Sequence, residues 1–209
     1  KGEITIPKNQ GDAAMTLTMT TATDSFLVDD VIISGKAQNN VYKVSDEEYE
    51  KMLEDSVYST GNNARIKQVI QNARDGKDVT LAYIGGSITE GALAKPNSMC
   101  YAEVSAKTFG VKYGKNNGEN VHFINAGMSG TPSDIDVVRY NRDVIDRLPE
   151  GSDHPDVLFI EFAVNDYGTA TAGKGYEGLI RQALKSGSAV VLVFSVFKQA
   201  SGGVVCGKD

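Results

Sequence analysis

The amino-acid sequence predicts an α/β protein with a doubly wound parallel sheet in three α/β/α layers, preceded by a β-rich segment. From residue 79 onward, apolar runs of strand length alternate with helical stretches, an order typical of βαβ units. These runs are apolar on both faces, as expected for parallel strands that helices cover on each side. Near the amino terminus, apolar and polar residues alternate instead, which predicts the β-rich segment.

The amino-terminal segment, residues 1–35, has the pattern of antiparallel strands. "MTLTMT" (15–20) alternates strictly, and "FLVDDVIISG" (26–35) is rich in β-forming residues and ends on glycine. A β-sandwich needs about 100 residues, so we interpret residues 1–35 as the last strands of a partial sandwich. A hairpin extension of the following domain remains the alternative. Asp29 and Asp30 are either ligands for a structural Ca²⁺ or a solvated strand edge.

Residues 36–78 are interpreted as a linker followed by lead-in helices. Ser45 and Glu48 form a capping box at the start of "DEEYEKMLEDSVYS", which predicts the first helix. A second helix is expected from Asn63 to Asp75, with apolar residues on one face, and Gly76 is expected to end it.

Residues 79–209 form the predicted α/β domain. We expect strands at 79–84, 121–125, 157–164 and 189–197, and helices near 98–109, 133–147 and 175–186. The run at 189–197 is the best membrane-span candidate and falls far short of the roughly 18–20 apolar residues of a span. The net charge of −6 argues against nucleic-acid binding. Two cysteines support neither a disulfide framework nor a zinc site, so we expect no metal.

Polar or glycine-rich loops follow the first, second and third strands of the predicted sheet. They read "GGSITEG", "NAGMSGTPSD" and "NDYG", and they contain Ser87, Gly130 and Asn165 in that order. In an open parallel sheet, ligands bind beyond the carboxyl ends of the strands. We therefore expect these residues to lie together at one edge of the sheet.

This set of residues has a chemical meaning in acyl transfer. A serine that attacks an ester creates a tetrahedral oxyanion, which fixed hydrogen-bond donors stabilise. The backbone N–H groups of Ser87 and Gly130 and the side-chain amide of Asn165 are candidate donors, each typically worth about 3–4 kcal/mol in the transition state. Taken alone, each loop has a plainer interpretation, as a turn or as a helix N-terminus with Ser133 as its cap. Their conjunction in this order favours a site.

Other motifs fit the sequence poorly. The nucleophile elbow G-x-S-x-G fails because Thr89 stands at its second glycine. The chain contains no G-x-x-x-x-G-K-[ST] motif, and its first strand–helix loop lacks G-x-G-x-x-G. A phosphate-binding protein of flavodoxin type is therefore disfavoured, and no organic cofactor is expected.

The loops resemble the signature blocks of the SGNH (GDSL-type) hydrolase superfamily. "IGGSITEG" resembles the first block with Ser87 as nucleophile, "INAGMSGTPS" the second with Gly130 as the oxyanion glycine, and "FAVNDYG" the third with Asn165 as side-chain donor. The lead-in "STGNNARIKQVIQNARDGKDVTLAYIGGSITEG" is similar to a bacterial subgroup of carbohydrate esterases. The resemblance extends over residues 60–200 or so.

The sequence departs from the family pattern in several places. Gly86 replaces the usual aspartate of the first block, and Ala163 replaces the usual glycine of the third. Neither change removes a catalytic atom. The family's last block, Asp-x-x-His, is absent from the 209 residues. We expect the complete protein to continue and to supply it, so that this chain has an oxyanion hole without a base and doubtful activity.

Neither histidine of the chain is expected to serve as the base. His154 precedes the third strand, whereas Asn165 follows it, and a strand of about eight residues separates its two ends by roughly 25 Å. A general base must lie within hydrogen-bond reach of its proton. His122 lies inside the second strand and is interpreted as a core or subsurface histidine.

The resemblance implies a secreted serine esterase that removes O-acyl groups, above all acetyl, from a plant polysaccharide such as xylan. Asp166 is expected to shape its loop rather than react. The segment "FLVDDVIISG" resembles the closing strand of jelly-roll carbohydrate-binding modules, which polysaccharide esterases commonly carry. The implied partner is an acylated polysaccharide or oligosaccharide, with no nucleic acid or membrane. The alternative is a carbohydrate-binding protein with a degenerate, inactive hydrolase domain.

Overall fold

The computed structural model describes residues 44–168, 170, 173–198 and 204–206. The expected β-rich segment at residues 1–35, with Asp29 and Asp30, lies outside these ranges. The chain divides into two units, Lys1–Ser56 and Val57–Asp209. In the part of the chain that is described, no helix has both the length and the apolar character needed to cross a membrane.

Helix α1 (Asp46–Ser56) is the described element of the amino-terminal unit. The N–H of Ser45 donates to Oε2 of Glu48 at 2.9 Å, and the N–H of Glu48 donates to Oγ of Ser45 at 3.2 Å. The backbone hydrogen bond from Ser45 is the main reason that the pKa of Glu48 lies below its ordinary value. This reciprocal pair confirms the predicted capping box.

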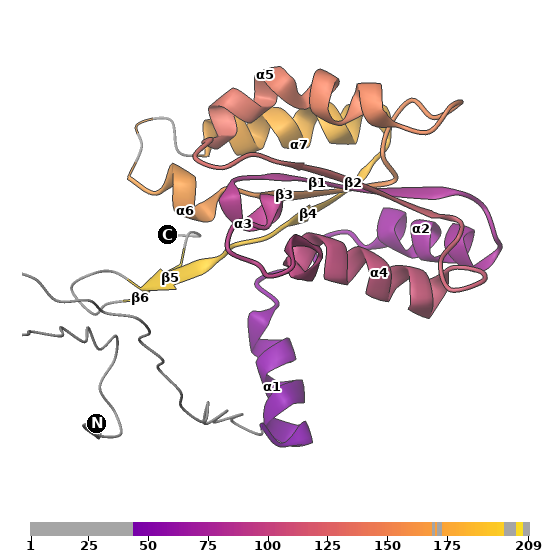
Figure 1. The fold of residues 1–209 in the computed structure, drawn as a ribbon, viewed down its shortest axis with the longest axis horizontal. Coiled ribbons are helices and arrows are strands. Elements are labelled where there is room, and N and C mark those ends of the chain that lie inside the picture. Colours follow the sequence, from indigo (N-terminus) through magenta and orange to yellow (C-terminus); the bar gives the residue numbers. More distant parts are fainter. Residues whose placement is uncertain (1–43, 169, 171–172, 199–203, 207–209) are drawn as a thin grey trace, which may run out of the picture. The chain divides into compact units, whose positions relative to one another are not determined.

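A parallel sheet of four strands forms the centre of the second unit, in the order β2-β1-β3-β4. Its strands are β1 (Val79–Gly85), β2 (Val121–Gly127), β3 (Val157–Glu161) and β4 (Ala189–Leu192). One face is covered by α2 (Ala64–Arg74) and α4 (Tyr101–Tyr113), and the other by α5 (Ser133–Asp143) and α7 (Lys174–Ser186), as Figure 1 shows. The predicted three-layer, doubly wound α/β fold is confirmed.

Apolar side chains pack on both faces of the central strands. Ile84 belongs to the core cluster on one side of the sheet, and Tyr83 belongs to the cluster on the other. The ring of Tyr83 stacks on that of Phe159 with centroids 4.3 Å apart, and its hydroxyl lies 2.9 Å from Oγ of Ser105. Burial raises the pKa of Tyr83 to about 12. This packing fixes the strands whose carboxyl ends carry the predicted site.

The end of the sheet differs from the prediction of one strand over 189–197. Strand β4 ends at Leu192, and β5 (Val196–Lys198) pairs antiparallel with β6 (Val204–Cys206) in a separate sheet. In the connection between β4 and β5, the ring of Phe194 lies against that of Tyr176, with ring centroids 6.1 Å apart. An apolar run of this kind does not reveal where tertiary packing draws the chain out of the sheet.

The third strand is also shorter than predicted. It ends at Glu161, and a short helix, α6 (Ala163–Asp166), takes the place of its expected continuation to residue 164. The N–H of Phe162 donates to Oη of Tyr176 on α7 at 2.6 Å rather than to a neighbouring strand. This side-chain acceptor ends the strand pairing and turns the chain toward Asn165.

The helices around the sheet follow the predicted order with shifted ends. Helix α4 begins at Tyr101, after a 3₁₀ turn at Asn97–Met99. Helix α5 ends at Asp143, and a separate 3₁₀ turn at Ile145–Arg147 replaces its expected last turn. A further short helix, α3 (Ser87–Glu90), follows β1 directly.

Candidate active site

The site lies where the strand order of the sheet reverses. Strand β1 neighbours both β2 and β3, so the connections after β1 and β3 leave toward opposite faces of the sheet. Such a switch point is the usual ligand site of an open α/β sheet. Ser87 follows β1 as the first residue of α3, and Asn165 follows β3 within α6. Figure 1 shows α3 and α6 at the same end of the sheet.

The side chain of Asn165 reaches the loop that carries Ser87. A Cβ atom placed on Gly86 would lie 2.3 Å from Oδ1 of Asn165 and 3.0 Å from its Cγ. The carboxamide therefore covers Gly86, the residue directly before Ser87. Any residue larger than glycine at position 86 must displace this carboxamide, which gives a physical reason for glycine where the family pattern has aspartate.

The loop after β2, which carries Gly130, is fastened to the same region. The N–H of Met128 donates to the carbonyl oxygen of Gly85 at 2.9 Å. The N–H of Ser129 donates to Oε2 of Glu90 at 3.0 Å, and Oγ of Ser129 donates to the same oxygen. Gly130 is exposed and has a φ of +77°, a conformation that favours glycine. The three predicted residues thus lie on loops that contact one another. Asn165 connects its own loop to the Ser87 loop, and Glu90 connects the Ser87 loop to the Gly130 loop.

Asp166 connects the loop after β3 to the start of α5. Its Oδ1 accepts the N–H of Ser133 at 2.8 Å, and its Oδ2 accepts the Ser133 hydroxyl at 2.5 Å, with both residues buried. The interpretation of Ser133 as the helix cap is wrong: Pro132 occupies the N-cap position, and Ser133 is the first helical residue. The carboxylate that caps the helix comes from a distant loop, as fits the loop-shaping role expected of Asp166.

The polar groups of this region differ in whether they already have partners. Ser129 and Ser133 are bonded as described, and Asn125 donates from Nδ2 to the carbonyl of Thr89 at 2.8 Å while its Oδ1 accepts the N–H of Gly127 at 2.8 Å. Within the described ranges, neither the hydroxyl of Ser87 nor the carboxamide of Asn165 has a hydrogen-bond partner. Both residues are partly exposed. As far as the described residues go, these two groups are available to bind a ligand.

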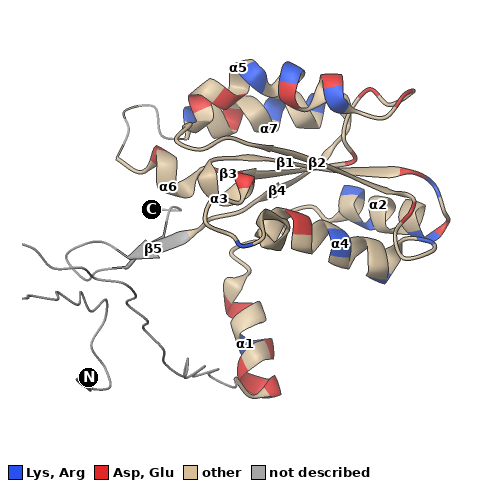
Figure 2. Cartoon of the chain, in the orientation of Figure 1, with Lys and Arg blue, Asp and Glu red and all other residues tan. Residues whose placement is uncertain are grey.

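A buried carboxyl group at the end of β3 was not identified from the sequence. Glu161 is 1% exposed, and neither of its carboxyl oxygens has a hydrogen-bond partner among the described residues. Burial is the main cause that raises its pKa above the ordinary value, and the charge of nearby Asp166 adds to it. Figure 2 shows that charged residues otherwise lie on the helices and connections rather than on the central strands. The sequence signal was a single glutamate in the apolar run "VLFIEFAV".

Both histidines lie at the opposite, amino end of the sheet. A Cβ on Gly187, just before β4, would lie 3.1 Å from Nε2 of His154, whose Nδ1 is 2.5 Å from Oδ1 of Asp153. His122 is the second residue of β2, and its Nε2 lies 3.2 Å from Oδ1 of Asp78. Its side chain is 37% exposed, so it is a subsurface rather than a core residue. Neither histidine is within reach of Ser87 at the carboxyl end.

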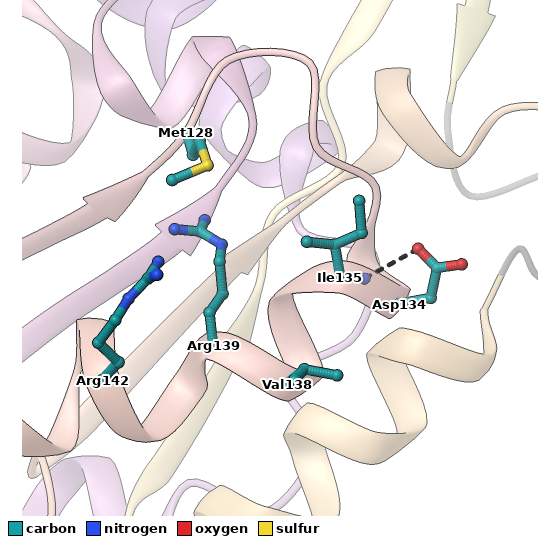
Figure 3. Close-up of a pocket in the computed structure, with 6 residues that line it drawn as sticks. All are labelled: Met128, Asp134, Ile135, Val138, Arg139 and Arg142. Carbon is teal, nitrogen blue, oxygen red and sulfur yellow. Dashed lines mark hydrogen bonds between the residues drawn. The ribbon is translucent and has the colours of Figure 1, made fainter.

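An open hollow of about 540 Å³ begins beside the Gly130 loop and continues along α5, as Figure 3 shows. Three apolar and three charged residues line it: Met128, Ile135, Val138, Asp134, Arg139 and Arg142. Arg139 is held by ion pairs with Asp136 and Asp143, and it also donates to the carbonyl of Ala126 at 2.9 Å. Across the described ranges, no group of three or more His, Cys, Asp and Glu residues could hold a metal ion.

Solved structures similar to this chain include esterases. A two-domain esterase (CEX) active on acetylated mannans, crystallised with mannopentaose, has 34% identity and a TM-score of 0.60, over 69% of this chain and 38% of that chain. A second crystal structure of a two-domain esterase (CEX) active on acetylated mannans has 33% identity and a TM-score of 0.57, over 66% of this chain and 36% of that chain. AlinE4, an SGNH-hydrolase family esterase, has 21% identity and a TM-score of 0.47, over 61% and 65%. No protein-family model and no curated protein sequence matches the chain.

The likeness to the two-domain esterase covers only part of that protein, since this chain spans 38% of its length. Within that part, the sequence identity is 34% and the TM-score is 0.60. Together with the three motif blocks around Ser87, Gly130 and Asn165, these findings support the SGNH resemblance. The chain has an α/β fold similar to that of the two-domain esterase over this part, and its three motif blocks resemble those of the SGNH superfamily.

Proposed function

We propose that this protein is a serine esterase that hydrolyses O-acyl esters, above all acetyl esters, on a polysaccharide. The observation that carries the proposal is the hydroxyl of Ser87, which has no hydrogen-bond partner among the described residues and lies next to Gly86, the residue that the Asn165 carboxamide covers. The similarity to an esterase active on acetylated mannans supports the substrate class. The motif resemblance adds xylan as a second candidate polymer.

In the proposed reaction, Oγ of Ser87 attacks the acyl carbonyl carbon, and the sugar oxygen leaves with a proton. The backbone N–H groups of Ser87 and Gly130 and Nδ2 of Asn165 donate hydrogen bonds to the oxyanion of the tetrahedral intermediate. Water then attacks the acyl-enzyme and releases the carboxylic acid. None of these steps requires a metal or an organic cofactor.

The reaction also requires a general base next to Ser87. The two histidines of the chain lie at the far end of the sheet and do not meet this requirement. In the SGNH superfamily that these motifs resemble, a histidine of an Asp-x-x-His block supplies it, and the 209 residues contain no such block. Loss of such a base typically lowers the rate by about 10³–10⁶-fold.

The direct test is hydrolysis of acetylated mannan, acetylated xylan and p-nitrophenyl acetate, combined with labelling by a fluorophosphonate. We expect acetate release and a single label on Ser87, and we expect Ser87→Ala to lose both without losing stability. Ser186→Ala, at the surface of α7, is the matched control. Polysaccharide binding without acetate release or labelling would instead identify a carbohydrate-binding protein with an inactive hydrolase domain.

The proposed substrate class also indicates where the protein acts. A polysaccharide cannot cross a cell membrane, so an enzyme that deacetylates it must reach it outside the cell. We therefore propose that the protein is secreted. Fractionation of the producing cells, with the protein detected by antibody, would test this.

A further inference from the structure

We propose that Glu90 is a positioning residue, which holds the Gly130 loop so that its backbone N–H faces the oxyanion. The inference rests on the proposed function, since it assigns a role within the same site. It comes from one contact between two loops that lie far apart in the sequence: Oε2 of Glu90 accepts both the N–H of Ser129, at 3.0 Å, and the Ser129 hydroxyl.

The segment that Glu90 holds has little else to fix it. Gly130 is exposed, and a Cβ atom on it would meet nothing within 4 Å. The loop is anchored before this point by Met128, whose N–H donates to Gly85, and after it by Thr131, whose Oγ1 donates to the carbonyl of Met128 at 2.8 Å. Between these anchors, within the described part of the chain, Ser129 forms its two hydrogen bonds with the carboxylate of Glu90. A glycine in such surroundings has the widest choice of backbone conformations.

The peptide bond between Ser129 and Gly130 carries the N–H proposed as an oxyanion donor. Because a peptide unit is planar, its orientation depends on the torsions of the residue before it. Glu90 binds that residue at both its backbone N–H and its hydroxyl. The carboxylate therefore limits rotation of this peptide, and preorganised donors are what an oxyanion hole requires.

Glu90 can act as a reference point because its own backbone is firmly held. Its N–H donates to the carbonyl of Gly86 at 3.0 Å, and a Cβ on Gly127 would lie only 2.2 Å from its nitrogen. Asn125 also binds the carbonyl of the preceding Thr89. Glu90 belongs to α3, which begins with Ser87. Through its bonds to Ser129, Glu90 therefore holds the Gly130 loop at a fixed position relative to α3, the helix that begins with the proposed nucleophile.

Substitutions of Glu90 can distinguish the effect of its hydrogen bonds to Ser129 from the effect of its negative charge. Since a single carboxylate oxygen accepts both bonds, the amide oxygen of glutamine can replace it. Glu90→Gln should therefore keep the loop in place, whereas Glu90→Ala should release it. Ser129→Ala should have an intermediate effect, because its backbone N–H can still donate to the carboxylate.

The experiment measures kcat and KM for p-nitrophenyl acetate, in the form of the protein that shows Ser87-dependent hydrolysis. We expect Glu90→Ala to lower kcat about tenfold to a hundredfold, somewhat less than loss of an oxyanion donor, with KM within about twofold. Glu90→Gln should stay within about threefold of the unchanged protein. Glu177→Ala, which removes a carboxylate from an exposed ion pair on α7, is the matched control and should change nothing.

Binding of a boronic-acid inhibitor, which forms a tetrahedral adduct on serine, provides the second measurement. Its affinity should fall with kcat in Glu90→Ala and recover in Glu90→Gln. An unchanged kcat in Glu90→Ala would overturn the inference, as would a glutamine variant as impaired as the alanine variant. A lower melting temperature with full activity per folded molecule would also overturn it. Failure of the proposed function is distinct, since the unchanged protein would then show no Ser87-dependent hydrolysis.

Discussion

The two ends of the central sheet use polar residues in different ways. At the amino end, Asn120 donates to the carbonyls of Ala73 and Lys77, at 3.0 and 2.7 Å, and accepts the N–H of Lys115 at 2.7 Å. At the carboxyl end, Asn165 has no hydrogen-bond partner among the described residues, although its side chain is packed over Gly86.

This difference separates residues that hold the fold from residues available for chemistry. A buried side chain with a full set of hydrogen bonds stabilises the structure, and its removal leaves unpaired backbone groups. A held but unpaired donor can bond to a substrate at no cost to internal bonds. Substitutions at the amino end should therefore affect mainly the free energy of unfolding, and those at the carboxyl end mainly the rate.

The largest effect is expected from Asn165→Ala. Loss of one oxyanion donor typically lowers kcat by about 10²–10³-fold, whereas the free energy of unfolding should change little. Asn120→Ala is the matched variant at the other end and should lower the free energy of unfolding by about 1–3 kcal/mol, with activity per folded molecule unchanged. Kinetics with p-nitrophenyl acetate and urea denaturation measure the two quantities. Equal loss of activity in both variants would remove the distinction between the two ends.

Asp166→Ala tests a residue of the carboxyl end that has a structural role. The substitution leaves the buried N–H and hydroxyl of Ser133 without their acceptor, which should lower the free energy of unfolding by about 1–3 kcal/mol. Urea denaturation measures the change, with the exposed Asp146→Ala as control. An unchanged midpoint would show that the connection between α6 and α5 adds nothing to stability.

Alanine substitutions at Gly86 and Gly85, two neighbouring residues, should differ in whether they lower kcat or the free energy of unfolding. The added methyl group meets the carboxamide of Asn165, a movable side-chain end, so we expect about a tenfold loss of kcat and little change in stability. At Gly85, the added methyl would lie 2.5 Å from the carbonyl oxygen of Glu161, a backbone atom. Gly85→Ala should therefore lower the free energy of unfolding by about 1–3 kcal/mol. Similar thermal stability of the two variants would contradict this assignment.

Glu161 should make stability depend on pH. Burial raises its pKa in the folded state above the ordinary value of 4.5, so the folded protein binds more protons than the unfolded chain. The stability that Glu161 contributes is fully present below pH 4.5. It is lost as the pH rises from 4.5 through the raised pKa of the folded state. Glu161→Gln should flatten this part of the stability curve and be more stable than the unchanged protein at neutral pH. Parallel pH profiles of the two melting temperatures would disprove the assignment.

The smallest effects are expected from His122→Ala and His154→Ala. Each histidine pairs with a carboxylate that is more than three-quarters exposed, and such exposed pairs contribute little to stability. Activity should stay within about twofold, since neither lies near the proposed nucleophile. A rate loss as large as that of Ser87→Ala, in either variant, would make that histidine the base.

The sequence by itself determined the features that depend on neighbouring residues. The capping box at Ser45, the helix ending before Gly76 and the apolar strands could be predicted because each depends on residues a few positions apart. The order of strands and helices then placed Ser87 and Asn165 at one end of the sheet, because parallel strands share a direction.

Only the tertiary structure decided which distant groups meet. It ended β4 at Leu192, gave the cap of Ser133 to Asp166, and placed Ser129 against Glu90 across 39 residues of sequence. These contacts arise because packing of the helices on the sheet brings loops together, and no local pattern encodes which loops those are. For the same reason, the sequence could name Asn165 as a donor but could not reveal that its carboxamide rests on Gly86.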